Sequence, residues 1–235
     1  MTQLLNGVVP LSRLGVIRVQ GEDAASFLLG QLTQDFALLD SRHARLAAFC
    51  TAKGRMLASF IGFKRSEDEI LLICDRSLLA STLKRLSMFV LRAKARLGDA
   101  TQDFALLGLA GSAAAHAMGD GTRPWDRKNA GDGAAIELYP AAGQRRALWV
   151  GPASVDMPAF ADQPPLDEAS WQWLEVQSAV ATLSAPVSDL FVPQMLNYES
   201  VGGVNFKKGC YPGQEIVARS QFRGTLKRRA YLAHA

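Results

Sequence analysis

The chain has 235 residues, of which 49% are hydrophobic and 20% charged, with a formal net charge of +4. This composition is typical of a folded globular protein and excludes a disordered chain. No apolar run reaches the roughly 18 residues of a transmembrane helix, and no secretory signal is evident, so we expect a cytoplasmic protein with no membrane partner. The three cysteines form no CxxC pair, so the sequence predicts neither a disulfide framework nor a metal site.

The first hundred residues predict strands followed by a helix. Residues 13–20 alternate as a strand does, and residues 22–32 have helical spacing. Three β-rich runs between residues 46 and 74 then predict a meander of antiparallel strands. Cys50 and Cys74 fall inside these runs, so we expect both thiols to be buried.

The pattern then alternates between helices and strands. Asp75 is a predicted N-cap for a helix over residues 76–89. Asp167 is a predicted cap for a helix that continues to residue 183, and residues 152–165 contain four prolines, as a linker would. The remaining predicted elements are strands at 93–99, 103–111, 135–140 and 147–151 and a helix at 112–118.

These elements predict an α+β fold with antiparallel sheets. We divide the chain into three segments: an N-terminal α+β subdomain at 1–100, a second at 101–183, and a loop and signature segment at 184–235. Residues 184–209 show little periodicity but contain several large apolar side chains, so we expect an irregular stretch that is packed rather than disordered.

Positive charge is concentrated near the C-terminal end of the sequence. From residue 201 onward there are seven basic residues and a single acid, Glu215. Such a local field attracts an anion, which leaves nucleic acid, an acidic protein face and a polycarboxylate ligand as alternatives. A solvated basic tail without function is the simplest explanation.

Residues 207–215, KKGCYPGQE, lie within this basic region. Pro212 fits the first position of a helix and Gly224 fits just beyond its end, so we expect a helix over residues 212–223. Its N-terminal amides, at Gly213 and Gln214, would favour an anion.

The same segment predicts a reactive thiol. Lys207, Lys208 and the helix N-terminus all favour the thiolate of Cys210. Glu215 and Arg219 would lie on one helical stripe, although each feature alone has a simpler explanation as a surface pair or a tight turn. No histidine has a patterned relation to Cys210, so a Cys–His enzyme is poorly supported.

The stretch FKKGCYPGQEIVAR resembles the signature of the YgfZ-type folate-binding proteins, relatives of the aminomethyltransferase of the glycine cleavage system. Three further stretches agree in order: GEDAASFLLGQLTQDF, CTAKGRM and FVPQMLNYESVGGVNF. The resemblance implies two intertwined subdomains, and a third barrel domain that would be absent or truncated here. It also implies a tetrahydrofolate-binding accessory protein that supports assembly or repair of iron–sulfur clusters in client enzymes.

The resemblance also implies roles for particular residues. Cys210 would be a functional thiol, and Glu215 would accept two N–H bonds from the pterin edge of the folate. Trp173 would stack on the pterin. The alternative role for Trp173 is packing in the core beside Trp171. The full set of candidate folate contacts is Glu215, Trp173, Tyr211, Gln214, Arg219, Lys208 and Arg223. As our own inference, we expect Lys53 and Arg55, together with Arg219 and Arg223, to meet the negative glutamate tail.

Two other functions stay open at this stage. A folate-dependent one-carbon transferase, moving an aminomethyl or methyl group, would need an acid shortly after the AKGR stretch, yet none occurs before Glu67. A nucleic-acid binder would use the basic C-terminal segment, where aromatic residues are sparse and the charge is modest. We therefore expect folate and iron–sulfur proteins as partners and no specific nucleic acid.

Overall fold

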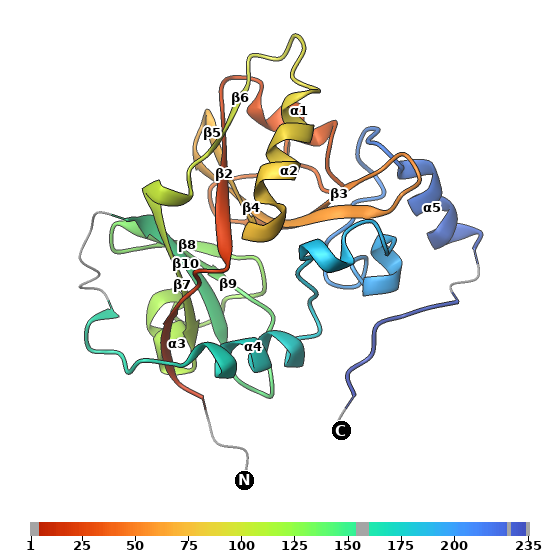
Figure 1. Ribbon diagram of the computed structural model, residues 1–235. Helices are drawn as coiled ribbons and strands as arrows, with labels where there is room; N and C mark the ends of the chain where they lie inside the picture. The colour runs from red at the N-terminus through yellow and green to blue at the C-terminus, as the bar shows by residue number, and fades with distance from the viewer. Residues whose placement is uncertain (1–4, 154–159, 225–226, 234–235) are drawn as a thin grey trace. The chain divides into compact units, whose positions relative to one another are not determined.

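The computed structural model describes residues 5–153, 160–224 and 227–233. The chain forms two compact units (Figure 1), which we describe separately. Unit 1 comprises Met1–Ser12, Thr101–Ala179 and Leu232–Ala235, and unit 2 comprises Arg13–Ala100 and Val180–Tyr231. The chain therefore passes from one unit to the other several times. The three consecutive segments expected from the sequence stay a prediction.

Unit 2 is built on a five-stranded antiparallel sheet with the order β3-β4-β5-β2-β6. Its strands are β2 (Leu14–Gln20), β3 (Ala44–Cys50), β4 (Met56–Ser66), β5 (Glu69–Asp75) and β6 (Arg96–Asp99). Its helices are α1 (Ala24–Leu29), α2 (Arg76–Ser87) and α5 (Gln214–Phe222), with short 3-10 turns at Ala185–Val187 (η3) and Pro193–Leu196 (η4). The predicted meander is confirmed as β3, β4 and β5.

Cys50 and Cys74 are buried in this sheet, as the sequence predicts. Burial raises the pKa of each thiol to about 12, so both stay protonated in the folded chain at neutral pH. Helix α2 packs against β2, β4, β5 and β6 and buries Leu78, Leu79 and Leu86. These buried positions lie on one face of the helix, which explains its amphipathic sequence.

Unit 1 is built on a second antiparallel sheet, in the order β1-β7-β10-β9-β8. Its strands are β1 (Gly7–Pro10), β7 (Phe104–Ala110), β8 (Arg127–Ala130), β9 (Gly133–Glu137) and β10 (Arg146–Pro152). Its helices are α3 (Ser112–Met118) and α4 (Glu168–Gln177), and a 3-10 turn, η1, spans Thr101–Asp103.

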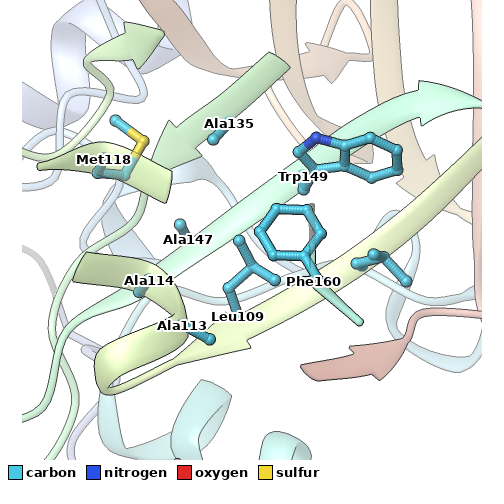
Figure 2. Packing of buried hydrophobic residues seen from close by; sticks show 9 residues of the cluster. Leu109, Ala113, Ala114, Met118, Ala135, Ala147, Trp149 and Phe160 are labelled. Carbon is cyan, nitrogen blue, oxygen red and sulfur yellow. The ribbon is translucent and has the colours of Figure 1, made fainter. Parts of the chain in front are cut away.

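The core of unit 1 joins helix α3 to the inner face of its sheet (Figure 2). The rings of Trp149 and Phe160 meet edge to face, with centroids 5.7 Å apart. The small residues Ala113 and Ala114 let α3 approach the sheet closely, because both are fully buried in the same cluster. The α+β class with two antiparallel sheets is thus confirmed.

The two capping predictions are confirmed. The Asp75 side chain accepts a hydrogen bond from the amide of Ser77 at 2.9 Å, and the Asp167 side chain accepts one from the amide of Ser170 at 2.8 Å. Each carboxylate satisfies an amide that the first helical turn leaves unpaired.

Several boundaries differ from prediction. The expected helix 22–32 is only Ala24–Leu29, and the helix expected to reach residue 183 ends at Gln177, since Ala179 adopts a left-handed φ of 57°. Strands β1 and β8 were not predicted, because each has only four residues and β8 is also polar. Of the expected linker 152–165, residues 154–159 lie outside the described part of the chain.

Within the described residues, no helix is long and apolar enough to cross a membrane.

The irregular stretch 184–209 is packed, as expected. Tyr198 is fully buried, and the hydroxyl of buried Thr33 donates to the Gly203 carbonyl at 2.6 Å while accepting from the amide of Ala48 at 2.8 Å. The Gln34 side chain donates to the Gly202 carbonyl at 2.7 Å. The TQDF stretch therefore fastens the late loop to strand β3.

We predict that Thr33→Val destabilises the chain by about 2–4 kcal/mol, because it leaves the Ala48 amide and the Gly203 carbonyl unpaired in the interior. Thr33→Ser keeps both hydrogen bonds and should cost only about 1 kcal/mol for the lost methyl group. Urea unfolding of both variants measures the difference. Equal stability of the two variants would show that the hydroxyl does not hold the loop.

Candidate functional site

The signature segment begins with a braced turn and continues into helix α5 in unit 2. The helix begins at Gln214 rather than at Pro212, and Gly213 is its N-cap with a left-handed φ of 82°. The predicted start is therefore wrong by two residues, because the left-handed conformation of Gly213 cannot belong to a helical turn. Pro212 precedes the cap instead of opening the helix.

The start of α5 lies directly against the turn that follows β3. A Cβ atom on Gly213 would lie 2.3 Å from the Thr51 carbonyl oxygen, and one on Gly54 would lie 3.0 Å from Cβ of Ile216. Both glycines have positive φ, so both the local conformation and the close approach exclude a side chain. Buried Gln194 donates to the Val217 carbonyl at 2.8 Å, which ties η4 to the same helix.

The four stretches that carry the family resemblance are therefore assembled within one unit. The early TQDF stretch binds the GGVNF loop, the CTAKGRM turn packs on the PGQEI stretch, and the VPQML stretch binds α5. They are far apart in the sequence and connect the signature segment to the rest of unit 2.

Lys208 and Tyr211 brace the turn from within. The Lys208 ammonium donates to the Gly209 carbonyl at 2.9 Å and lies 4.3 Å from the centroid of the Tyr211 ring, in a cation–π contact. Burial lowers the pKa of Lys208 to about 8, against smaller opposing effects of Asp35 and Cys210. Burial also raises the pKa of the Tyr211 phenol, with a further contribution from Cys50.

Cys210 lies between these two braced residues and is exposed. Glu215 is also exposed, with 84% of its side chain accessible, and its closest ion-pair contact is 3.6 Å to the Arg219 guanidinium. A solvated pair of this kind contributes little to stability, so the Glu215 carboxylate is free to exchange partners. Arg223 is exposed at the end of the same helix, and Gln214 is partly buried.

Trp173 belongs to unit 1, where it is 40% exposed on helix α4. Its neighbour Trp171 is the core residue: its ring covers Gly108 and lies 5.0 Å from the Arg146 guanidinium carbon. The core-packing alternative for Trp173 is therefore wrong. The two tryptophans are two residues apart on one helix, so they point in different directions.

Two of the four cations expected to meet a folate tail lie in the AKGR stretch, and of these Lys53 is exposed at the turn after β3. Arg55 is engaged within unit 2, since its guanidinium donates to the Leu190 carbonyl at 2.7 Å. This bond holds the irregular stretch against β4. Lys53 is thus the freer of the two for an anionic ligand.

The sequence did not predict that Asp35 acts on Lys208. The Asp35 carboxylate raises the pKa of Lys208, and the larger effect of burial lowers it. Asp35 lies in the TQDF stretch, which the resemblance marks, but nothing in the spacing connects residue 35 with residue 208. It also missed Arg146, whose buried guanidinium has a pKa lowered to about 10 by desolvation. Among the described residues, no group of three His, Cys, Asp or Glu side chains could hold a metal ion.

Comparison with known proteins first defines the class of protein. The sequence family described as the GCVT N-terminal domain matches residues 3–132 of the chain. The chain also resembles the glycine cleavage system aminomethyltransferase T from Bartonella henselae, with a TM-score of 0.74 at 17% identity, over 95% of this chain and 65% of that protein. At that identity the likeness establishes the fold alone. The chain is therefore a protein of the aminomethyltransferase-like fold with a GCVT N-terminal domain.

Two curated relatives narrow the assignment. One is the tRNA-modifying protein YgfZ of Edwardsiella ictaluri, which is 32% identical over 227 residues, covering 92% of this chain and 67% of the relative. The other is the protein of the same name from Vibrio vulnificus, 32% identical over 225 residues, covering 94% of this chain and 68% of the relative. The chain belongs to the YgfZ family and spans about two thirds of the length of these relatives.

We predict that Gly213→Ala destabilises the chain by about 2–4 kcal/mol, because the methyl group meets the Thr51 carbonyl and the residue must keep a positive φ. Gly209→Ala is the matched control: no atom lies within 4 Å of its added Cβ, so its effect should stay within about 0.5 kcal/mol. Thermal and urea unfolding compare the two. A tolerated Gly213→Ala would show that the helix start does not depend on this contact.

Lys208 should make stability depend on pH. Its pKa is about 8 in the folded chain and near 10.5 when unfolded, so between these values the unfolded chain binds more protons and stability rises with pH. Relative to Lys208→Met, we expect the free energy of unfolding to increase by about 1 kcal/mol between about pH 7 and pH 9. Denaturant unfolding at several pH values measures this difference. A difference that does not change with pH would mean that Lys208 is solvated.

Proposed function

We propose that the chain binds a tetrahydrofolate and acts as an accessory protein in the assembly or repair of iron–sulfur clusters in client enzymes. One observation carries the proposal: the signature segment presents the Cys210 thiol and the Glu215 carboxylate to solvent from a turn that buried side chains hold in place. Membership of the YgfZ family supports it, and a cytoplasmic location belongs to the same proposal.

The side chains present have the chemistry that a folate requires. The exposed Glu215 carboxylate can accept two N–H bonds from an aminopyrimidine edge, a charge-assisted arrangement. Its contact with Arg219 is long and solvated, so giving it up costs little. Arg219 on helix α5 and Arg223 at its end, both in unit 2, offer cations for the carboxylates of a glutamate tail.

The buried residues Lys208 and Tyr211 and the partly buried Gln214 have a different part in this proposal. Lys208 and Tyr211 are buried against one another, and Gln214 opens the helix that carries Glu215. We assign them to the binding site through the shape they give to the turn. A tight turn reduces the conformational entropy that Cys210 and Glu215 lose on binding.

Cys210 is the proposed point of action on partner proteins. A single thiolate cannot hold an iron–sulfur cluster by itself, so any cluster chemistry needs further groups from a partner. The relatives are named tRNA-modifying proteins. We therefore propose that the clients include enzymes that modify tRNA and contain an iron–sulfur cluster.

The alternative function, one-carbon transfer from a folate, has less support. Strand β4, which follows the AKGR stretch, carries no acidic side chain, and Glu67 lies in the turn beyond it with 95% of its side chain exposed. The described residues of this part of unit 2 thus offer no carboxylate where the reaction would need one.

We predict that Glu215→Gln weakens tetrahydrofolate binding by at least about tenfold, because the neutral amide replaces a charge-assisted acceptor. Glu67→Gln is the control, since Glu67 is another exposed glutamate of unit 2 that pairs with a lysine, the largely covered Lys64. Its affinity should equal that of the wild-type chain. Calorimetric titration under anaerobic conditions measures both, and equal affinities for the two variants would remove Glu215 from the site.

We predict that Cys210→Ala removes most of the activity of cluster-dependent tRNA-modifying enzymes in cells that contain this variant as their only copy. Folate affinity should be unchanged, because Glu215 is intact. The level of the modified nucleoside in bulk tRNA is the readout, with equal amounts of variant and wild-type protein confirmed by immunoblot. Full modification with the variant would make Cys210 a structural residue.

A further inference from the structure

An apolar surface that the proposed site does not use lies at the end of helix α2. Beyond the last helical residue, Ser87, the side chains of Met88, Phe89 and Leu91 are 63%, 41% and 85% exposed. A single exposed apolar residue is ordinary, but three within four positions concentrate apolar surface at one place in the chain. We call these three residues the apolar tip; they begin the connection from α2 to β6 (Figure 1).

A hollow of about 380 Å³ adjoins the apolar tip. Met88 contributes to its lining, together with Phe49 and Leu57 from strands β3 and β4. Lys84 and Arg85, both exposed on the last turns of α2, contribute the cations. Its size is at the lower end of the range for ligand sites and suits one or two large apolar side chains.

The lining of this hollow carries two cations, Lys84 and Arg85, and no acidic side chain. Residues 76–98 contain six basic side chains and no acidic one. Lys94 is paired with Glu22, whereas Lys84, Arg85 and Arg92 have no ion pair with any described residue. Two cations at a helix C-terminus are explained by the helix dipole, but Arg92 lies beyond the helix. Lys84 and Arg85, two cations without ion pairs to described residues in the lining of an apolar hollow, complement a partner that is both acidic and apolar.

We propose that the apolar tip and its hollow dock an acidic amphipathic helix of a partner protein, with an apolar side chain of that helix in the hollow. This inference rests on the proposed function, in which the chain serves other proteins. Methionine, phenylalanine and arginine are enriched at protein interfaces, and methionine adapts to different partners, which suits an accessory protein with several clients.

Two other anionic partners fit the surface less well. Single-stranded nucleic acid stacks its bases on aromatic rings, and Phe89 is the only aromatic side chain of the tip. An anionic membrane attracts flanking cations and apolar loops, but a flat lipid surface leaves a hollow unfilled. A helix with a projecting side chain matches both the charge and the concavity.

The test places a photo-reactive amino acid at position 91 of the full chain, in cells where this protein replaces the natural copy. We expect crosslinking to a protein segment that is net acidic and apolar at helical spacing, as mapped by mass spectrometry. The double variant Lys84→Glu/Arg85→Glu should lower the yield roughly tenfold, because it reverses the charge beside the hollow. The control variant Lys227→Glu/Arg228→Glu makes the same charge change at two other exposed positions of unit 2 and should leave the yield unchanged.

Several results would overturn the proposal. Crosslinks to RNA, to lipid, to a second copy of this chain or to a neutral or basic segment would each assign the surface to another occupant. Absence of crosslinks, or equal yields for both charge-reversed variants, would leave no docking site. Failure of the proposed function is separate: full tRNA modification with Cys210→Ala alongside an intact acidic crosslink would reject the role of the thiol while the docking surface stands.

Discussion

The signature segment depends on one close approach between two backbones. The cap of α5 at Gly213 meets the turn from Thr51 to Gly54 at distances that admit no Cβ atom. This contact fixes where the helix begins, and therefore where Glu215 and Arg219 lie on it. It also explains why glycine occurs in both stretches, since each needs a positive φ as well as the space. The arrangement of the candidate site thus depends on two residues without side chains.

Burying Lys208 beside Cys210 has an energetic cost. Removing the Lys208 ammonium from water lowers its pKa to about 8, which means that the folded chain holds this charge at a disadvantage. The hydrogen bond to the Gly209 carbonyl and the contact with the Tyr211 ring offset part of this desolvation cost. A chain selected for stability alone would place an apolar side chain here. A buried cation two residues from an exposed thiol is therefore more consistent with a functional turn than with a purely structural one.

Local patterns in the sequence predicted the elements whose causes are local. The cap at Asp75, the amphipathic face of α2 and the meander that buries Cys50 and Cys74 all depend on residues a few positions apart. The start of α5 was misplaced because its cause, the Thr51 carbonyl, lies far away in the sequence. Spacing alone could not show that Lys208 is buried, nor which of the two neighbouring tryptophans faces the core.

Family resemblance identified the signature segment, yet it did not point to the α2 tip, whose evidence is the exposure of its apolar side chains. The two regions use opposite chemistry. The signature segment presents a thiol and a carboxylate from a hydrogen-bonded turn, whereas the tip presents exposed apolar side chains near cations without ion pairs to described residues. Both belong to unit 2, so a partner bound at the tip would be held by the same unit that carries Cys210. In the proposed function, holding a partner there would raise its effective concentration at the Cys210 thiol.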